Sequence, residues 1–392
     1  MMAAAATMFA ACTQSDFVNS LPEQGPKAID FKSGHINKST RAENSSSNYT
    51  LKFSDHHNSF AVWGYKNVAE DPVFNGKTVN VTLGADAGSE IYKYDGLVYW
   101  DESANFYQFY SAAPADGQWN FVAPTNAEKN NGYFTRTIEL DESKINLGQG
   151  SHLTSLKPAE GEKNQDLLIA APCEPAIGET VGFEFIHILS RLNVVVSKKQ
   201  GLAEEVRTFE VSVHNLNLAG DFNESLATAN KTTGSYARWE NQRTPGDYVA
   251  KRDTGAVVQE GVERHVIQTL VIPQASAYGT IKVNGADADE TSAPYLCVEY
   301  GIENGTTTVT DGEGKTKTVK TFEKFKKYYN LAQIFGKENG QPLNFNEGWE
   351  NTLTLTIGPK SIDFKATVAT WALDTKKENT LHNTPNPSDS NQ

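Results

Sequence analysis

Short runs of alternating apolar and polar residues, separated by turn-forming residues, recur along almost the whole of this 392-residue chain. Residues 60–65, 78–83, 134–140 and 208–213 are rich in β-branched and aromatic side chains. A period of two is typical of strands that bury one face. The frequent Gly, Asn, Asp and Pro between the runs favour β-sandwiches over alternating strands and helices. The sequence therefore predicts an all-β protein.

The same pattern continues through the second half of the chain, where one hairpin is marked by its turn. Residues 308–319 carry Asp311-Gly312 at their centre, a dipeptide typical of tight turns between paired strands. The best helix candidate is residues 322–335, in which four aromatic side chains could share one face, although aromatic residues suit strands as well. Further strands are predicted at 28–32, 181–187, 191–196, 268–273, 352–357 and 361–371.

A break in the pattern at residues 170–178 predicts where the chain divides into domains. This segment contains two prolines and a glycine, which do not suit a central strand. We expect an N-terminal β-sandwich at 49–174 and a C-terminal one at 175–374. The polar residues 375–392 read as a disordered tail.

The N-terminus carries a candidate lipidation signal at Cys12. The small apolar residues 3–11 close on Ala10-Ala11-Cys12 and resemble a lipobox, the cleavage and lipidation signal of bacterial lipoproteins. Residues 1–11 contain no Lys or Arg, whereas a signal peptide starts with a positive region, so we expect the true start of the signal to be missing. The alternative is an ordinary apolar N-terminus with an incidental cysteine. Residues 13–48 read as a tether that contains a short strand.

Composition excludes several classes of partner. The 48 acidic and 35 basic residues give a net charge of -13, which repels phosphate backbones and argues against nucleic-acid binding. After Cys12 no apolar run approaches the roughly 20 residues that span a bilayer. The two other cysteines, Cys173 and Cys297, could pair, but their spacing fits no zinc motif, and two unpaired thiols are the favoured interpretation.

The order of several local motifs resembles the fimbrillin-like family, the lipoprotein subunits of type V pili in Bacteroidales. The resemblance rests on an early aromatic strand, an aromatic pair of strands that ends at a proline, a passage into the second domain and two C-terminal matches. It implies two tandem transthyretin-like β-sandwiches, a place on the cell surface and outer membrane, and other pilin subunits as partners. The motifs are residues 60–65, 98–114, 166–171, 183–194, 272–274 and 366–371.

The resemblance also implies how such a subunit would be assembled. A trypsin-like protease would cleave after Arg41, so that the mature chain starts at Ala42; the alternative is a solvated arginine in a linker. Cleavage would remove the strand at 28–32, with Ile29 and Phe31 on one face, and leave unpaired backbone groups for a neighbouring strand to enter.

A repeated tetrapeptide predicts the entering strand. The sequence Ile-Asp-Phe-Lys at residues 29–32 recurs at 362–365, which places Ile362 and Phe364 on one strand face just as Ile29 and Phe31 are placed. We therefore expect the two segments to be interchangeable. The alternative is that the 361–371 strand stays in its own domain, and that the protein is a tip or accessory subunit.

No motif in the sequence predicts catalysis. The chain lacks a Gly-x-Ser-x-Gly elbow, a His-Glu-x-x-His zinc motif and a phosphate loop, and His56-His57 would face opposite sides of a strand. We expect His187 to be a satisfied buried histidine, and no enzyme, metal or cofactor. The aromatic residues are expected to fill the core. Host proteins or glycans are possible further partners of such a subunit. Two rivals remain: a non-polymerising surface lipoprotein that binds glycans, and an enzyme such as a glycosidase, which needs two facing carboxylates.

Overall fold

The protein is represented by a computed structural model that covers most of the chain. Its described residues are 26–36, 52–67, 72–86, 89–125, 131–144, 146–150, 164–228, 238–275, 282–284, 287–289, 293–335, 337–338, 341–342, 344–359 and 361–370. Cys12, Arg41, Ala42 and the tail at 375–392 lie outside these residues.

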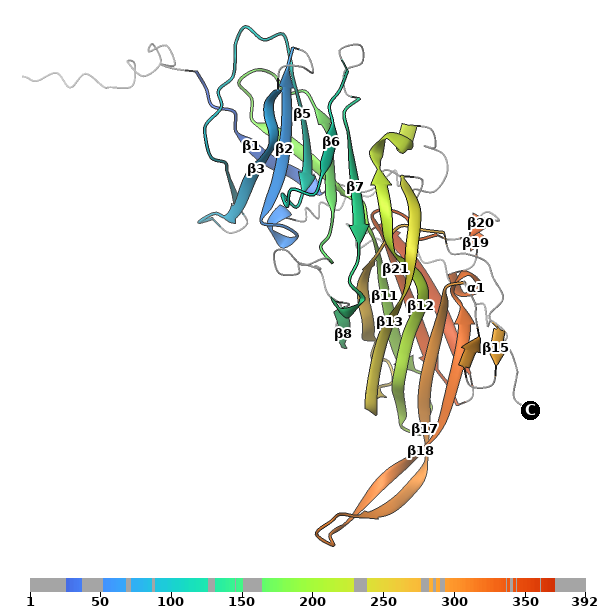
Figure 1. Ribbon diagram of the computed structural model, residues 1–392. Helices are drawn as coiled ribbons and strands as arrows, with labels where there is room; N and C mark the ends of the chain where they lie inside the picture. Colours follow the sequence, from blue (N-terminus) through green and yellow to red (C-terminus); the bar gives the residue numbers. More distant parts are fainter. Residues whose placement is uncertain are drawn as a thin grey trace, which may run out of the picture.

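The protein is all-β, and three large sheets account for nearly all of its described elements (Figure 1). Only one short α-helix is present among the described residues, α1 (Leu331–Phe335). Three 3₁₀ turns complete the element order: η1 (Phe53–Asp55), η2 (Glu142–Lys144) and η3 (Glu224–Thr228). No described helix has the length and apolarity that crossing a membrane requires.

The first sheet has seven strands and forms the N-terminal part of the molecule. In spatial order they are β1 (Phe31–Ile36), β10 (Val181–His187), β9 (Leu168–Cys173), β5 (Tyr107–Ala113), β2 (Ser59–Lys66), β3 (Pro72–Leu83) and β4 (Glu90–Lys93). All neighbours are antiparallel except β1 and β10, which run parallel.

The second and third sheets lie mainly in the C-terminal part. The second has the order β18 (Thr316–Asn330), β17 (Tyr295–Thr310), β12 (Val206–Asn223), β7 (Tyr133–Glu139) and β6 (Asn120–Val122), with β13 (Trp239–Val258) also paired to β12. The third has the order β22 (Ile362–Thr370), β21 (Trp349–Ile357), β11 (Ser190–Lys198), β14 (Arg264–Val271) and β8 (Asn146–Gly150). Two short pairs remain, β15 (Lys282–Asn284) with β16 (Asp287–Asp289), and β19 (Lys337–Glu338) with β20 (Gln341–Pro342).

The long strand β12 joins the two parts of the molecule. Along one edge of it, β17 pairs with Val206–His214 and β7 pairs with Ala219–Asn223, so β7 and β17 lie end to end. The buried side chains accordingly form one continuous cluster that runs from β2 and β7 to β21 and β22. A second cluster occupies the concave face of the seven-stranded sheet.

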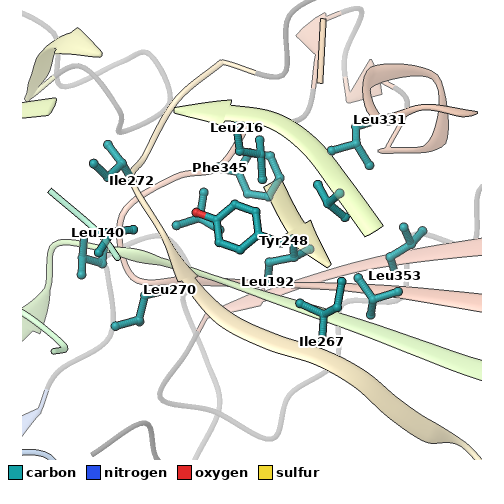
Figure 2. Close-up of a cluster of buried hydrophobic side chains, with 14 of the residues drawn as sticks. Leu140, Leu192, Leu216, Tyr248, Ile267, Leu270, Ile272, Leu331, Phe345 and Leu353 are labelled. Atoms are coloured by element: carbon teal, nitrogen blue, oxygen red, sulfur yellow. The ribbon is translucent and has the colours of Figure 1, made fainter. Parts of the chain in front are cut away.

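The centre of the continuous cluster is built from leucine, isoleucine and tyrosine side chains of the second and third sheets. Figure 2 shows Tyr248 of β13 among Leu216 of β12, Leu192 of β11 and Leu270 of β14. Tyr248 is 1% exposed, and its hydroxyl has no hydrogen-bond partner among the described residues. Burial raises the pKa of this phenol.

The predicted strands agree well with the sheets. The sequence of β2 is apolar on both faces because the strand lies between the two hydrophobic clusters. Phe60 and Val62 point into the concave cluster, whereas Trp63 and Tyr65 point into the continuous one. The hairpin at 308–319 is confirmed, since Thr310 pairs with Thr316 around the Asp311 turn.

The predicted helix at 322–335 is wrong over most of its length. Residues 322–330 belong to β18, which pairs with β17 from Thr316 to Asn330, and only Leu331–Phe335 are helical. The aromatic spacing fits a strand equally well, and long-range pairing with β17 decides between the two structures.

The break at residues 170–178 does not end a sheet. β9 ends inside this segment at Cys173, β10 begins after it at Val181, and the two strands are neighbours in the seven-stranded sheet, so the boundary predicted between residues 174 and 175 falls between paired strands of that sheet. Pro172 sits inside β9 because β10 pairs only as far as Ala170, and because the ladder with β5 is irregular between Phe109 and Ser111. Where the domains divide stays a prediction.

Candidate functional site

The strand predicted at 28–32 closes the N-terminal sheet on itself. Its side chains alternate as expected: Ile29 is fully buried and Phe31 is 6% exposed, whereas Asp30 and Lys32 face solvent. The sheet ladder with β10 begins at Phe31, later than predicted, and Ala28 forms an isolated bridge with Tyr99. Residues 27–31 therefore lie between β10 and the segment that follows β4.

Backbone hydrogen bonds hold this segment from both sides. The Ile29 N–H donates to the Val98 carbonyl at 2.8 Å, and the Trp100 N–H donates to the Lys27 carbonyl at 2.9 Å. On the other side, the Val181 N–H donates to the Asp30 carbonyl at 2.8 Å. Removing residues 27–31 would leave all these groups without their partners, which is the condition for another strand to enter.

Phe31 fills the middle of the concave core. Its ring lies among five others, which we call the Phe31 ring cluster: Phe60, Phe74, Tyr94, Phe109 and Phe183. The ring of Phe183 stacks on Phe31 at 5.9 Å between centroids, and the other four meet it edge-on at 5.3–6.5 Å. Such pairs add about 0.5–1.5 kcal/mol each beyond the area that they bury.

Tyr94 and Gly182 contact the segment from its two sides. The Tyr94 hydroxyl donates to the Ile29 carbonyl at 2.7 Å. Burial is the largest cause that raises the pKa of this phenol, so it remains a donor at neutral pH. On β10, a Cβ at Gly182 would lie 3.1 Å from Cε of Lys32, so glycine gives the lysine stem room to cross the strand.

The second copy of the Ile-Asp-Phe-Lys sequence lies in β22, at the edge of the third sheet. Ile362 is 2% exposed and Phe364 is 6% exposed, and both belong to the continuous core. The ring of Phe364 meets Tyr329 edge-on at 4.5 Å. β22 pairs with β21 over its full length from Ile362 to Thr370. The two copies therefore have the same burial pattern, but each occupies its own core.

Three predicted residues cannot be placed. Cys12, the candidate lipidation site, and Arg41 and Ala42, the candidate cleavage site, lie outside the described residues. The remaining cysteines are placed: Cys173 of β9 and Cys297 of β17 are unpaired thiols. Burial raises the pKa of each thiol to about 12, which leaves both unreactive at neutral pH.

The aromatic side chains that could have formed a sugar platform are mostly core residues. Trp63, Trp100 and Tyr110 are 7%, 4% and 1% exposed. Their burial confirms the prediction that they pack the sheets, and a glycan platform would have to be built from other residues.

A buried cluster of two histidines and an aspartate is the group that the sequence did not predict. His56 follows η1, Asp166 precedes β9 and His187 ends β10, and they are 2%, 0% and 3% exposed. Nδ1 of His187 lies 2.7 Å and Nδ1 of His56 lies 3.2 Å from Oδ2 of Asp166. We call these three residues the His–Asp cluster. The prediction of a buried, hydrogen-bonded His187 is confirmed; its partners lie too far away in sequence for any local motif to reveal them.

A second arrangement has the geometry of a hydrolytic triad on the outer face of the second sheet. Oγ of Ser212 lies 2.7 Å from Nε2 of His214, whose Nδ1 lies 2.8 Å from Oδ1 of Asp247. Ser212 is fully buried, and its hydroxyl also donates to Glu210 at 3.1 Å.

The surroundings of this triad do not suit acyl transfer. Ser212 belongs to a strand paired on both sides, with Val249 of β13 and Cys297 of β17. Its backbone N–H therefore serves the sheet, whereas a hydrolase needs N–H donors directed at a developing oxyanion. We interpret the group as a polar network that ties β12 to β13.

The comparison with protein families agrees with the resemblance found in the sequence. The profile of the fimbrillin-like proteins matches residues 40–371. The chain belongs to the fimbrillin-like family. As a member of this family, the protein is a fimbrial or adhesion subunit of the cell surface. No curated protein matches the chain.

The solved structures that the chain matches are remote in sequence. A fimbrial protein from Bacteroides vulgatus is 15% identical, covers 88% of this chain and 99% of its own, and has a TM-score of 0.48. A candidate cell adhesion protein from Bacteroides uniformis is 16% identical, covers 90% of this chain and 100% of its own, and has a TM-score of 0.47. The tip fimbrial protein Mfa3 from Porphyromonas gingivalis is 9% identical over 81% of this chain and 95% of its own, with a TM-score of 0.37.

Proposed function

We propose that this protein is a type V pilus subunit that polymerises by exchanging its N-terminal strand for a strand of a neighbouring subunit. The observation that carries the proposal is the way in which residues 27–31 are held in the N-terminal sheet. Two buried side chains of this segment complete the concave core, and hydrogen bonds from both sides hold its backbone. An extended segment held in this way can be replaced by any strand with the same alternation.

The proposal includes processing and export. Lipidation at Cys12 would hold the precursor at the outer membrane, with residues 27–31 acting as a plug. Cleavage after Arg41 by a trypsin-like protease would separate residues 27–31, together with β1, from the mature chain, because the site lies between β1 and η1 in the sequence. Once the plug has left, the exposed ring cluster and unpaired backbone groups would drive the entry of a new strand.

The donor that we propose is β22 of another copy, with Ile362 and Phe364 in the places of Ile29 and Phe31. In the monomer this strand covers its own core, so donation would uncover Leu353 and Leu355 of β21. Such a donation leaves the former place of β22 empty, so the apolar area that Ile362 and Phe364 bury in the neighbouring subunit must offset the area uncovered beside β21. Binding of a host protein or a glycan to the outer surface of the polymer would add adhesion without changing how the subunits assemble.

The test is to cleave the purified precursor with a trypsin-like protease and then add a synthetic peptide of residues 361–370. A new N-terminus at Ala42, followed by binding of the peptide and loss of residues 26–36, is the expected result. A matched peptide with Ile362→Asp and Phe364→Asp should not bind. Normal polymers from a chain that lacks residues 361–392 would exclude β22 as the donor, and cleaved protein that binds no strand would refute the exchange itself.

A further inference from the structure

The His–Asp cluster has the ligand set of a transition-metal site. Two imidazoles and one carboxylate are side chains that zinc prefers, and structural or catalytic zinc sites combine them with a fourth ligand. The candidate ligand atoms of His56, Asp166 and His187 all lie within 4.8 Å of one another. They come from three separate segments, so only the fold brings them together.

Asp166 and His187 are in the protonation states that bind a metal ion. Burial alone would raise the pKa of Asp166, but the charges and hydrogen bonds of His187 and His56 lower it overall, so the carboxylate is ionised. Burial lowers the pKa of His187, against the opposing effect of Asp166, so its imidazole is neutral at pH 7. Metals bind neutral imidazole and ionised carboxylate.

The distances are close to those of a tetrahedral site. Ligand atoms about 2.0–2.1 Å from a tetrahedral zinc ion lie about 3.3–3.4 Å from one another. The 3.2 Å between His56 Nδ1 and Asp166 Oδ2 is already near this value, and the 2.7 Å to His187 Nδ1 must lengthen by about 0.6 Å. The two imidazole rings have centroids 5.2 Å apart and are inclined at 64° to each other, so the histidines approach Asp166 from different directions.

One further atom points to a ligand. Oδ1 of Asp166 is buried and has no hydrogen-bond partner among the described residues. A buried carboxylate oxygen without a partner is costly, because burial removes its hydration. If the carboxylate bound the ion through both oxygens, Oδ1 would supply a fourth ligand atom in a distorted geometry, because the two oxygens of one carboxylate lie closer together than the other ligand atoms.

The charges around the cluster allow a cation. Arg191 is close enough for its charge to lower the pKa of His187, which opposes a positive ion. Glu350 lies 3.6 Å from Arg191 and offsets that charge. Asp166 itself is the remaining negative charge, and it sits at the centre of the cluster.

We propose that His56, Asp166 and His187 form a zinc-binding site that ties η1 and strands β9 and β10 together. The site is inaccessible in the folded chain, so the metal enters as the protein folds, as in other structural zinc sites. It lies at the end of β10, the strand that holds the N-terminal segment. Zinc binding does not depend on strand exchange, so the zinc site and the proposed function are tested independently of each other.

The experiment uses the full chain without a metal-affinity tag, refolded in the presence of excess EDTA, of zinc chloride or of cobalt chloride. After gel filtration we expect one metal ion per chain in the zinc and cobalt samples and none in the EDTA sample. The cobalt sample should show the visible absorption band of a four-coordinate cobalt site. Zinc at about 100 times its dissociation constant should raise Tm by about 5 °C relative to the EDTA sample.

Two near-isosteric variants test the ligands, and one tests specificity. Asp166→Asn and His56→Asn should each weaken zinc binding by at least the roughly 10–100-fold that loss of an outer partner costs. His214→Asn removes a described histidine outside the cluster that also faces a carboxylate, Asp247, and should leave the affinity unchanged. Wild-type protein that retains no metal overturns the proposal, whether or not the variants fold, and so does Asp166→Asn protein that binds zinc as tightly as wild type.

Discussion

Phe31→Ala is the substitution that best tests whether the N-terminal segment is held as a plug. Phe31 is 6% exposed and its ring touches five other rings. Replacing a buried phenylalanine by alanine costs about 3–5 kcal/mol. Because β1 is the last strand at one end of the sheet order, the N-terminal segment can detach locally, and this requires less free energy than global unfolding.

The release of the segment can be followed at a single amide. The Val181 N–H donates to the Asp30 carbonyl, so it exchanges with solvent only when the segment leaves. A loss of about 3–5 kcal/mol corresponds to an exchange rate that rises by about 10²–10³-fold or more. The Phe345 N–H, which bonds to Gln274 in the other core, provides an internal control and should not change.

Phe364→Ala is the matched variant. Phe364 has the same 6% exposure and the same sequence neighbours, but it packs in the continuous core against Tyr329. It should lower the free energy of unfolding of the C-terminal part and leave exchange at Val181 unchanged. If Phe31→Ala accelerates exchange at Val181 by less than about fivefold, or less than 1 kcal/mol, the ring cluster does not hold the segment.

Three other predictions concern the cores. Tyr248→Phe removes a buried hydroxyl without a partner among the described residues, so the free energy of unfolding should rise by up to about 1–3 kcal/mol; a loss in denaturant titrations would show that the hydroxyl is bonded. Gly64→Ala should cost about 1–3 kcal/mol, because a methyl group there would lie 2.8 Å from the Phe109 ring, and an unchanged Tm would contradict this packing. Burial raises the pKa of Tyr110 and Tyr300 to about 12, above the value of about 10 in an unfolded chain. Their contribution to stability is therefore complete below pH of about 10 and is lost as the pH rises through about 12; tyrosinate absorbance that develops fully by pH of about 10 in the folded protein would refute it.

The strands were predictable because alternation is a local property. In β3, Val79 and Val81 face the core and Asn80 and Thr82 are exposed, as the period of two requires; only Leu83 at the end of the strand departs from it by being exposed. In β2 every residue from Ser59 to Tyr65 is buried, which the sequence reports as an unbroken apolar run. Ile29 and Phe31 were predicted as buried partners on one face for the same reason, and the structure confirms that burial.

The failures share one physical cause, namely pairing with residues far away in the sequence. Residues 322–330 carry aromatic side chains that suit a helix or a strand, and β17 makes them a strand. Pro172 reads as a strand breaker, but it lies where its neighbours do not need its N–H. The phrase "buried histidine" described His187 correctly without indicating Asp166 or His56, which lie 21 and 131 residues away.

The sequence by itself determined the all-β class, the membership of the fimbrillin-like family and the pairing of Ile with Phe in two matching segments. Each of these depends on residue types at short, fixed spacing. Only the tertiary structure decided that residues 27–31 are held between β10 and the segment after β4, that β22 covers its own core, and that two histidines meet one aspartate. These arrangements depend on how sheets close and strands pair over long distances, and no local pattern of side chains encodes that.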